Sequence, residues 1–286
     1  MTNNEKLMYQ ILGNISNTDT PIIFKGALIT KLILSDHGFT DVERMTKDID
    51  GDWIGTPPTM KHLEDTLNNS LGGLKNQYFV KAYRQYESEK SAGFYVVDKD
   101  TNKNIFKMDI AIKPTIGSKL YYFGDMTIKG VLPTEVLADK ITAMSSNKLF
   151  RRMKDVTDIY ALSHCVEVET DKIWDICKEK NHEVQSFDGF YNRKSEVEHA
   201  YNMLRGVDGK PDFDVIYTYI SKFVKPFAEK IIGNKVWNSD KAAWRDVDVR
   251  AKGKPSLIAR LDAADKKIKA EYGAARSDKT KSAERD

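Results

Sequence analysis

The pattern of apolar residues changes at about residue 131, and no other feature of the sequence constrains the fold as strongly. Before this point, short runs rich in strand-forming residues are separated by polar turns, which is typical of a β-sheet. Strands are predicted over residues 46–54, 77–87, 93–98 and 105–113. From Pro133 to about Phe227, nearly every segment has the helical period instead. Strands followed by helices predict an α+β chain.

Three helices are predicted among the strands, over residues 4–16, 27–34 and 58–74, and the last of them ends at Gly72-Gly73. The pattern divides the chain into a sheet domain (residues 1–130), a helical domain (131–239) and a charged tail (240–286) that is partly helical or disordered.

Composition excludes several classes of protein. The 45 Lys and Arg residues nearly balance the 42 Asp and Glu residues, so the surface has no general basic coat for nucleic acid. Two cysteines are too few for a disulfide framework and indicate free thiols in a reducing compartment. The N-terminus lacks a signal peptide's apolar region, and no apolar run approaches the ~18–20 residues of a membrane span. We therefore expect a cytoplasmic protein with no membrane partner.

Three aspartates on predicted strands form the main candidate site. Asp48 and Asp50 point to the same face because side chains alternate along a strand, and Asp109 lies opposite the apolar residues of a later strand. Carboxylates arranged in this way suit Mg²⁺, which prefers oxygen ligands and often binds together with substrate phosphates. The alternative is that these are ordinary acids on a strand surface.

The segment Lys25-Gly26-Ala27 stands where a predicted strand turns into a helix. A glycine at this point lets backbone N–H groups approach a phosphate, and the helix N-terminus adds a favourable dipole. A simple turn glycine is the alternative for Gly26.

Two further segments carry charge on predicted helices. Lys140 falls on the apolar stripe of its helix, so it either extends to solvent or meets an anionic partner, such as a triphosphate. Asp155 and Asp158 lie near the buried side of the next helix, where helix capping and dipole stabilisation are the alternative explanation. The neighbouring cations Arg151, Arg152 and Lys154 are in reach of these acids and can pair with them.

Taken together, these segments resemble the nucleotidyltransferase toxins of the AbiEii/AbiGii type, within the DNA-polymerase-β-like nucleotidyltransferase superfamily. The resemblance covers roughly residues 20–165. It rests on four segments in the expected order: Phe24-Lys-Gly-Ala-Leu28, Arg44-Met-Thr-Lys-Asp-Ile-Asp50, Leu137-Ala-Asp-Lys-Ile-Thr-Ala143 and Lys154-Asp-Val-Thr-Asp158-Ile-Tyr160. It implies a small mixed β-sheet with flanking helices, followed by a helical domain and enclosing a nucleotide cleft.

The resemblance also implies a role for each site residue. Nucleotide binding falls to Lys25, Gly26, Ala27, Lys140 and Asp158, metal binding to Asp48, Asp50 and Asp109, and catalysis to Asp48, Asp50, Lys140 and Asp155. Asp109 either binds the metal or accepts the proton of the acceptor hydroxyl. The chain departs from the family pattern at Ala27, where a Gly or Ser usually follows the glycine, so a hydroxyl contact to phosphate is missing.

The predicted function is a Mg²⁺-dependent toxin that transfers a nucleoside monophosphate from a nucleoside triphosphate to an acceptor hydroxyl. The acceptor is the 3′ end of a tRNA, another RNA or a protein hydroxyl, and a cognate antitoxin protein is the expected partner. Two alternatives are a catalytically silent nucleotide-binding module and a nucleotidyltransferase that modifies small molecules of the antibiotic type.

Overall fold

The computed structural model describes residues 1–86, 91–146, 149–231 and 233–247. The chain forms two units, Met1–Arg245 and Asp246–Asp286. Nearly all of the second unit, and with it the predicted helix or disorder of the charged tail, lies outside the described residues. The sheet, the helices and the candidate site belong to the first unit.

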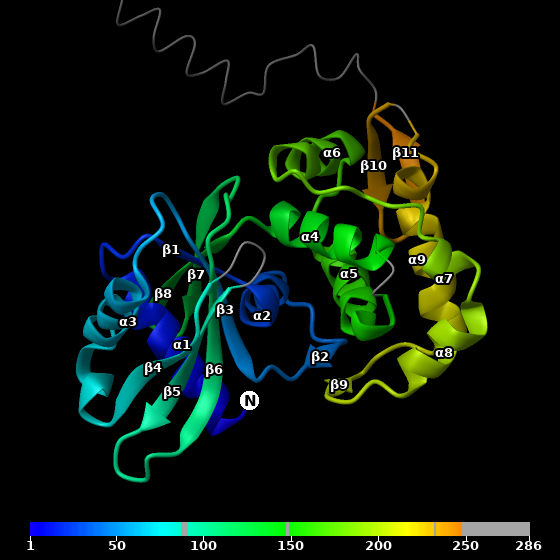
Figure 1. The fold of residues 1–286 in the computed structure, drawn as a ribbon. Coiled ribbons are helices and arrows are strands. Elements are labelled where there is room, and N and C mark those ends of the chain that lie inside the picture. The colour runs from blue at the N-terminus through cyan, green and yellow to red at the C-terminus, as the bar shows by residue number, and fades with distance from the viewer. Residues whose placement is uncertain (87–90, 147–148, 232, 248–286) are drawn as a thin grey trace, which may run out of the picture. The chain divides into compact units, whose positions relative to one another are not determined.

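A seven-stranded mixed sheet is built in the first half of this unit, in the order β4-β5-β6-β3-β1-β8-β7 (Figure 1). Its strands are β1 (Ile22–Lys25), β3 (Asp48–Trp53), β4 (Tyr78–Arg84), β5 (Ala92–Asp98), β6 (Asn104–Ala111), β7 (Ser118–Phe123) and β8 (Met126–Val131). β3 pairs with β6 and β1 pairs with β8 in parallel, whereas the other neighbours are antiparallel. The predicted α+β class with a mixed sheet is confirmed.

Three helices flank the sheet: α1 (Asn3–Ser16), α2 (Gly26–Asp36) and α3 (Met60–Asn69). α1 begins with a capping box, in which Glu5 N–H donates to the Thr2 hydroxyl and Thr2 N–H donates to the Glu5 carboxylate. Its apolar side packs on β1 and β8, α2 packs on β1 and β3, and α3 packs on β4. The prediction that the third helix continues to residue 74 was wrong. Gly72 has φ +59° and begins a separate 3₁₀ turn, η1 (Gly72–Asn76).

The second half of the unit is mainly helical, as predicted. Its helices are α4 (Pro133–Ser145), α5 (Met153–Cys165), α6 (Thr170–Glu179), α7 (Asp188–Tyr191), α8 (Lys194–Asn202) and α9 (Phe213–Ala228), with a 3₁₀ turn η2 (Leu149–Arg151). Two small sheets accompany them: β2 (Glu43–Arg44) pairs with β9 (Val207–Asp208), and β10 (Lys235–Asn238) pairs with β11 (Ala243–Asp246). No helix among the described residues is long and apolar enough to span a membrane.

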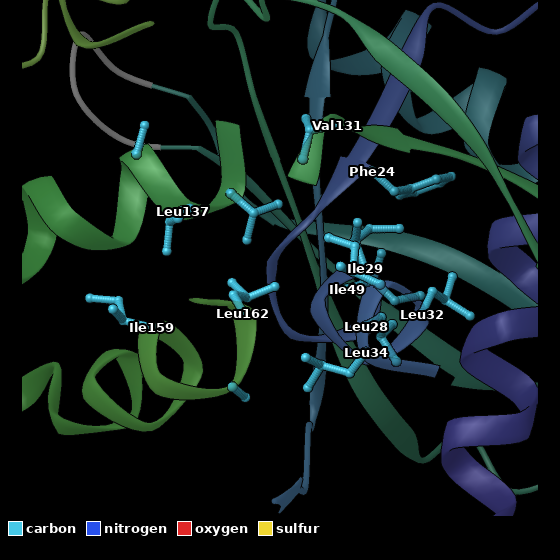
Figure 2. Close-up of a cluster of buried hydrophobic side chains, with 14 of the residues drawn as sticks. Phe24, Leu28, Ile29, Leu32, Leu34, Ile49, Val131, Leu137, Ile159 and Leu162 are labelled. Atoms are coloured by element: carbon cyan, nitrogen blue, oxygen red, sulfur yellow. The ribbon is translucent and has the colours of Figure 1, made fainter. Parts of the chain in front are cut away.

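One hydrophobic core joins the sheet to the helices (Figure 2). Phe24 of β1, Leu28 of α2 and Ile49 of β3 belong to the same buried cluster as Leu137 of α4 and Leu162 of α5. The cluster packs the helix pair α4 and α5 beside α2 and the sheet. The core thereby packs α4 and α5 against the part of the sheet that carries the predicted aspartates.

Two further parts of the fold differ from the sequence expectation. The hairpin of β7 and β8 was not predicted, because Leu120 and Tyr122 are exposed while Tyr121 is buried, so β7 lacks the usual order of apolar and polar positions. The strand β11 lies within residues 240–286, the range predicted for the tail. The domain boundaries stay predictions, since the sheet and the helices share one unit.

Candidate active site

The sheet brings the predicted aspartates to one place. Asp50 of β3 is the direct register partner of Asp109 on β6, and Asp48 is the partner of Lys107. Partners on adjacent strands point to the same face of a sheet, so the three carboxylates lie side by side. Asp48 is exposed and accepts a hydrogen bond from the Thr46 hydroxyl at 3.2 Å, whereas Asp50 and Asp109 are partly buried.

Asp50 is the electrostatically strained member of this group. Burial, with a further contribution from the neighbouring charge of Asp48, raises the pKa of Asp50 to about 6. Asp109 acts in the same direction, while Lys25 and Arg44 partly oppose the shift. The unfavourable charge on Asp50 would be relieved by a cation.

The N-terminus of α2 lies against this carboxylate. Gly26 begins the helix with φ +76°, and a Cβ at this position would stand 2.3 Å from Asp50 Oδ2. Lys25, at the N-cap position, makes no side-chain capping bond to the helix. The first backbone N–H groups of α2 therefore point to the site without a side-chain cap, which is an arrangement suited to an anion.

Lys25 is directed to another partner. Its ammonium forms an ion pair with Asp52, whose side chain is fully buried. The sequence analysis did not select Asp52, although the alternation that places Asp48 and Asp50 on one face places Asp52 there as well.

The facing wall comes from α4 and α5. Lys140 of α4 donates to Asp155 Oδ1 at 3.1 Å and to Asp158 Oδ2 at 2.5 Å, and Arg44 also pairs with Asp158. Burial by itself would lower the pKa of Lys140, but Asp158 and Asp155 outweigh it and hold this pKa above its usual value. The anionic partner expected for Lys140 is thus supplied by the chain itself.

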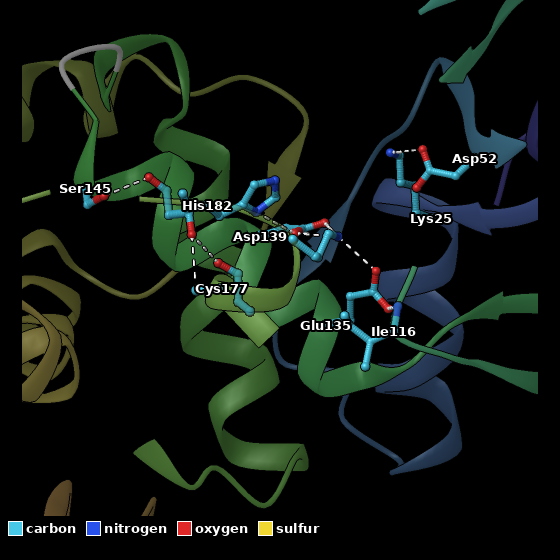
Figure 3. A network of polar contacts seen from close by, with 11 residues as sticks. Lys25, Asp52, Ile116, Glu135, Asp139, Ser145, Cys177 and His182 are labelled. Atoms are coloured by element: carbon cyan, nitrogen blue, oxygen red, sulfur yellow. Dashed lines mark hydrogen bonds and ion pairs between the residues drawn. The ribbon is translucent and has the colours of Figure 1, made fainter. Parts of the chain in front are cut away.

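A second charged network adjoins this wall (Figure 3). Lys180 pairs with the fully buried Glu135 and with Asp139, each at 2.8 Å, and the His182 ring lies 3.4 Å from Asp139. Glu135 also accepts a hydrogen bond from the Ile116 N–H at 3.1 Å, which ties α4 to the segment before β7. None of these residues was predicted, because Lys180 follows Glu135 by 45 positions and the contact depends on the packing of α4 against α6.

A cleft of about 410 Å³ separates the two walls. It is lined by the predicted residues Lys25, Gly26, Ala27, Asp50, Asp109, Lys140 and Asp155. Lys113, Arg152 and His182 line it as well, and the first two add positive charge. Asp158 is buried behind Lys140, and Asp48 lines an adjacent hollow together with Lys47, Lys154 and Arg205.

The carboxylates suit a divalent cation, although they do not form a complete cage. Among the described residues, no group of three or more His, Cys, Asp and Glu side chains is gathered closely enough to hold a metal ion. Asp109 is paired with Arg84 at 2.5 Å, which leaves Asp48 and Asp50 as the principal donors. Two carboxylates completed by substrate phosphates and water are the donor set that Mg²⁺ commonly takes.

Comparison with known families assigns the chain to the nucleotidyltransferases. The model that matches, over residues 10–243, describes the nucleotidyl transferase AbiEii toxins of type IV toxin–antitoxin systems. The chain belongs to this family, and the resemblance seen in the sequence and the predicted class of enzyme are confirmed. No curated protein matches the chain.

Several solved structures are similar at low identity. MenT4, a nucleotidyltransferase toxin from Mycobacterium tuberculosis H37Rv, is 12% identical, with a TM-score of 0.41 over 79% of this chain and 90% of its own. An antigenic nucleotidyltransferase-like protein from Paracoccidioides brasiliensis is 10% identical, with a TM-score of 0.38 over 70% and 92%. The Megavirus polyadenylate synthase is 12% identical, with a TM-score of 0.32 over 86% and 52%.

Proposed function

We propose that this chain transfers a nucleoside monophosphate from a nucleoside triphosphate to the 3′ hydroxyl of an RNA, within the cleft between β3, β6 and α4. The observation that carries the proposal is the register of Asp50 with Asp109, beside the helix N-terminus that starts at Gly26. This arrangement places carboxylates for a metal next to backbone donors for a phosphate.

The triphosphate would lie along the cationic lining of the cleft. Lys113 and Arg152 line the cleft, and the first N–H groups of α2 open onto it. An ammonium has three N–H donors, and Lys140 uses two of them on Asp155 and Asp158. We assign the third to a phosphate oxygen, so that Asp158 acts as a positioning residue for Lys140.

Asp48 and Asp50 would hold Mg²⁺, with Asp109 as a further ligand or as the group that accepts the proton of the attacking hydroxyl. Bound Mg²⁺ supplies charge neutralisation on the triphosphate. In the transfer, the acceptor oxygen forms a bond to the α-phosphorus, the bond from this phosphorus to the β-phosphate oxygen breaks, and pyrophosphate leaves. The chain contributes position and electrostatic stabilisation and forms no covalent bond of its own.

The acceptor and the partner follow from the same reasoning. Local cations border the site, with Arg152 in the cleft and Lys154 and Arg205 in the hollow beside Asp48, and these suit an RNA backbone. Because the family is one of toxins in toxin–antitoxin systems, we propose a cognate antitoxin as the neutralising partner.

The test is a transfer assay with α-labelled nucleoside triphosphates, Mg²⁺ and total RNA. Asp50→Asn removes a metal ligand and should lower transfer more than about a hundredfold, because such a ligand supplies several kcal/mol of transition-state stabilisation. Asp65→Asn, at an exposed carboxylate on α3, is the matched control and should transfer normally. Calorimetry should also show weaker Mg²⁺-dependent nucleotide binding in Asp50→Asn.

Three results would contradict the proposal. Full transfer by Asp50→Asn would remove the metal role. Nucleotide binding without transfer to any acceptor would indicate a silent binding module. Transfer to an aminoglycoside in a parallel reaction, with none to RNA, would indicate a small-molecule enzyme.

A further inference from the structure

The face of the sheet that bears the aspartates continues beyond the cleft across β6, β5 and β4. On β6, Phe106 and Met108 are buried, whereas Lys107 points to the opposite face, which also carries Asp109. The register continues this face from Lys107 to Tyr95 on β5 and from Tyr95 to Lys81 on β4. We call Lys81, Tyr83, Tyr95 and Lys107 the tyrosine–lysine face.

The rings of Tyr83 and Tyr95 form a platform, and the ammonium of Lys107 lies over both rings. The ring centroids of Tyr83 and Tyr95 are 4.3 Å apart, and Lys107 Nζ lies 5.6 Å and 5.9 Å from them. Tyr83 is 38% exposed, and Lys81 and Lys107 are exposed. Solvent-exposed aromatic rings beside lysines are typical of surfaces on which unpaired bases stack.

The platform is connected to the candidate active site. The ring of Tyr83 lies over Gly93, where a Cβ would stand 2.6 Å from the Tyr83 ring, and Gly93 is the register partner of Asp109. The guanidinium carbon of Arg84 is 5.5 Å from the Tyr83 ring, and the same guanidinium pairs with Asp109. A nucleic-acid strand that lies along this face would therefore have one end at the carboxylates.

We propose that the tyrosine–lysine face binds the single-stranded end of the acceptor RNA. A base stacks on the Tyr83 ring, and the phosphates that flank it contact Lys81 and Lys107. This inference rests on the proposed function, because it assigns the acceptor of the same reaction. An unpaired strand is required, since bases within a duplex cannot lie on a protein ring.

The test measures the binding of a short, fluorescein-labelled oligoadenylate to the full chain by fluorescence anisotropy, in the absence of nucleotide and Mg²⁺. Tyr83→Ala should weaken binding by about tenfold or more, whereas Tyr83→Phe keeps the ring and should bind normally. Lys81→Ala and Lys107→Ala should each lower the salt dependence, by about 0.7 in the slope of log Kd against log salt. The same sequence in a duplex should bind more weakly than the single strand.

Tyr122→Ala is the matched control, because Tyr122 is 65% exposed on β7, at the other edge of the sheet. Binding by Tyr83→Ala equal to that of the unmodified chain would overturn the inference, and so would an unmodified chain that does not bind the oligonucleotide. If Tyr83→Ala fails to fold, the two lysine variants decide the outcome. An unmodified chain that binds the oligonucleotide but transfers no nucleotide would separate a failure of the transfer chemistry from a failure of this surface.

Discussion

The two walls of the cleft handle charge in opposite ways. On the helical wall, Lys140 is bonded to Asp155 and Asp158, and its pKa is held above its usual value. On the sheet wall, Asp50 stands beside Asp48 and Asp109, and its pKa is raised to about 6. The charges of the helical wall therefore compensate one another within the chain, whereas the carboxylates of the sheet wall repel one another, and the proposed Mg²⁺ would relieve that repulsion.

The two arrangements of charge should contribute differently to the stability of the fold and to its activity. Removing one member of a buried pair of compensating charges destabilises the fold, because the other member stays buried without that partner. Charges that repel one another weaken the fold and are kept for what they bind. The two walls should thus respond differently to substitution.

The largest effect is expected on the helical wall. Lys140→Met leaves Asp155 and Asp158 without their shared ammonium, and the free energy of unfolding should fall by about 3–5 kcal/mol. Urea unfolding measures this change. The control is Lys61→Met on α3, where the lysine is 86% exposed and pairs with Asp65, and the loss should stay below about 1 kcal/mol. Equal losses in both variants would show that the buried network does not stabilise the fold.

The sequence predicted the sheet wall better than the helical wall. Alternation along one strand places Asp48 and Asp50 on the same face, and the apolar pattern of another strand places Asp109. Local periodicity is enough for these positions. The register that pairs Asp50 with Asp109 is set by the assembled sheet, and no pattern within either segment specifies it.

The helical wall depends on contacts between distant segments. Lys140 meets Asp158 across the packing of α4 on α5, and Arg44 reaches the same carboxylate from 114 positions away. No local pattern marks such a contact. The apolar stripe indicated that Lys140 needs an anionic partner, but it did not distinguish a phosphate from the chain's own carboxylates.

An intermediate effect is expected at the junction of the two walls. In Gly26→Ala, the new Cβ meets Asp50 Oδ2 at 2.3 Å, and the residue must also keep φ +76°. Gly38→Ala is the matched control, because Gly38 has φ +66° but nothing within 4 Å of a Cβ. Both variants should lose about 1–2 kcal/mol to the backbone conformation. Only Gly26→Ala should also lose transfer, by about a hundredfold, because Asp50 is displaced. Normal transfer by Gly26→Ala would contradict the close fit.

A further effect is a pH dependence on the sheet wall. The pKa of Asp50 is raised from its usual 3.8 to about 6, so between these values the folded chain binds more protons than the unfolded chain. The free energy of unfolding should therefore fall as pH rises through this window, by about 3 kcal/mol, because each unit of pKa difference corresponds to about 1.4 kcal/mol. Asp50→Asn lacks this titration, and the difference between the two unfolding curves isolates it.

Asp65→Asn supplies the baseline for this comparison, since its exposed carboxylate lies on α3, away from the cleft. At pH 7, the unmodified chain should be less stable than Asp50→Asn in the absence of divalent ions. Added Mg²⁺ should reduce this difference in stability or reverse its sign, because an ion that binds only the folded state stabilises that state. If Mg²⁺ shifted the thermal unfolding of Asp50→Asn and the unmodified chain equally, the sheet wall would not be the part of the molecule that requires a cation.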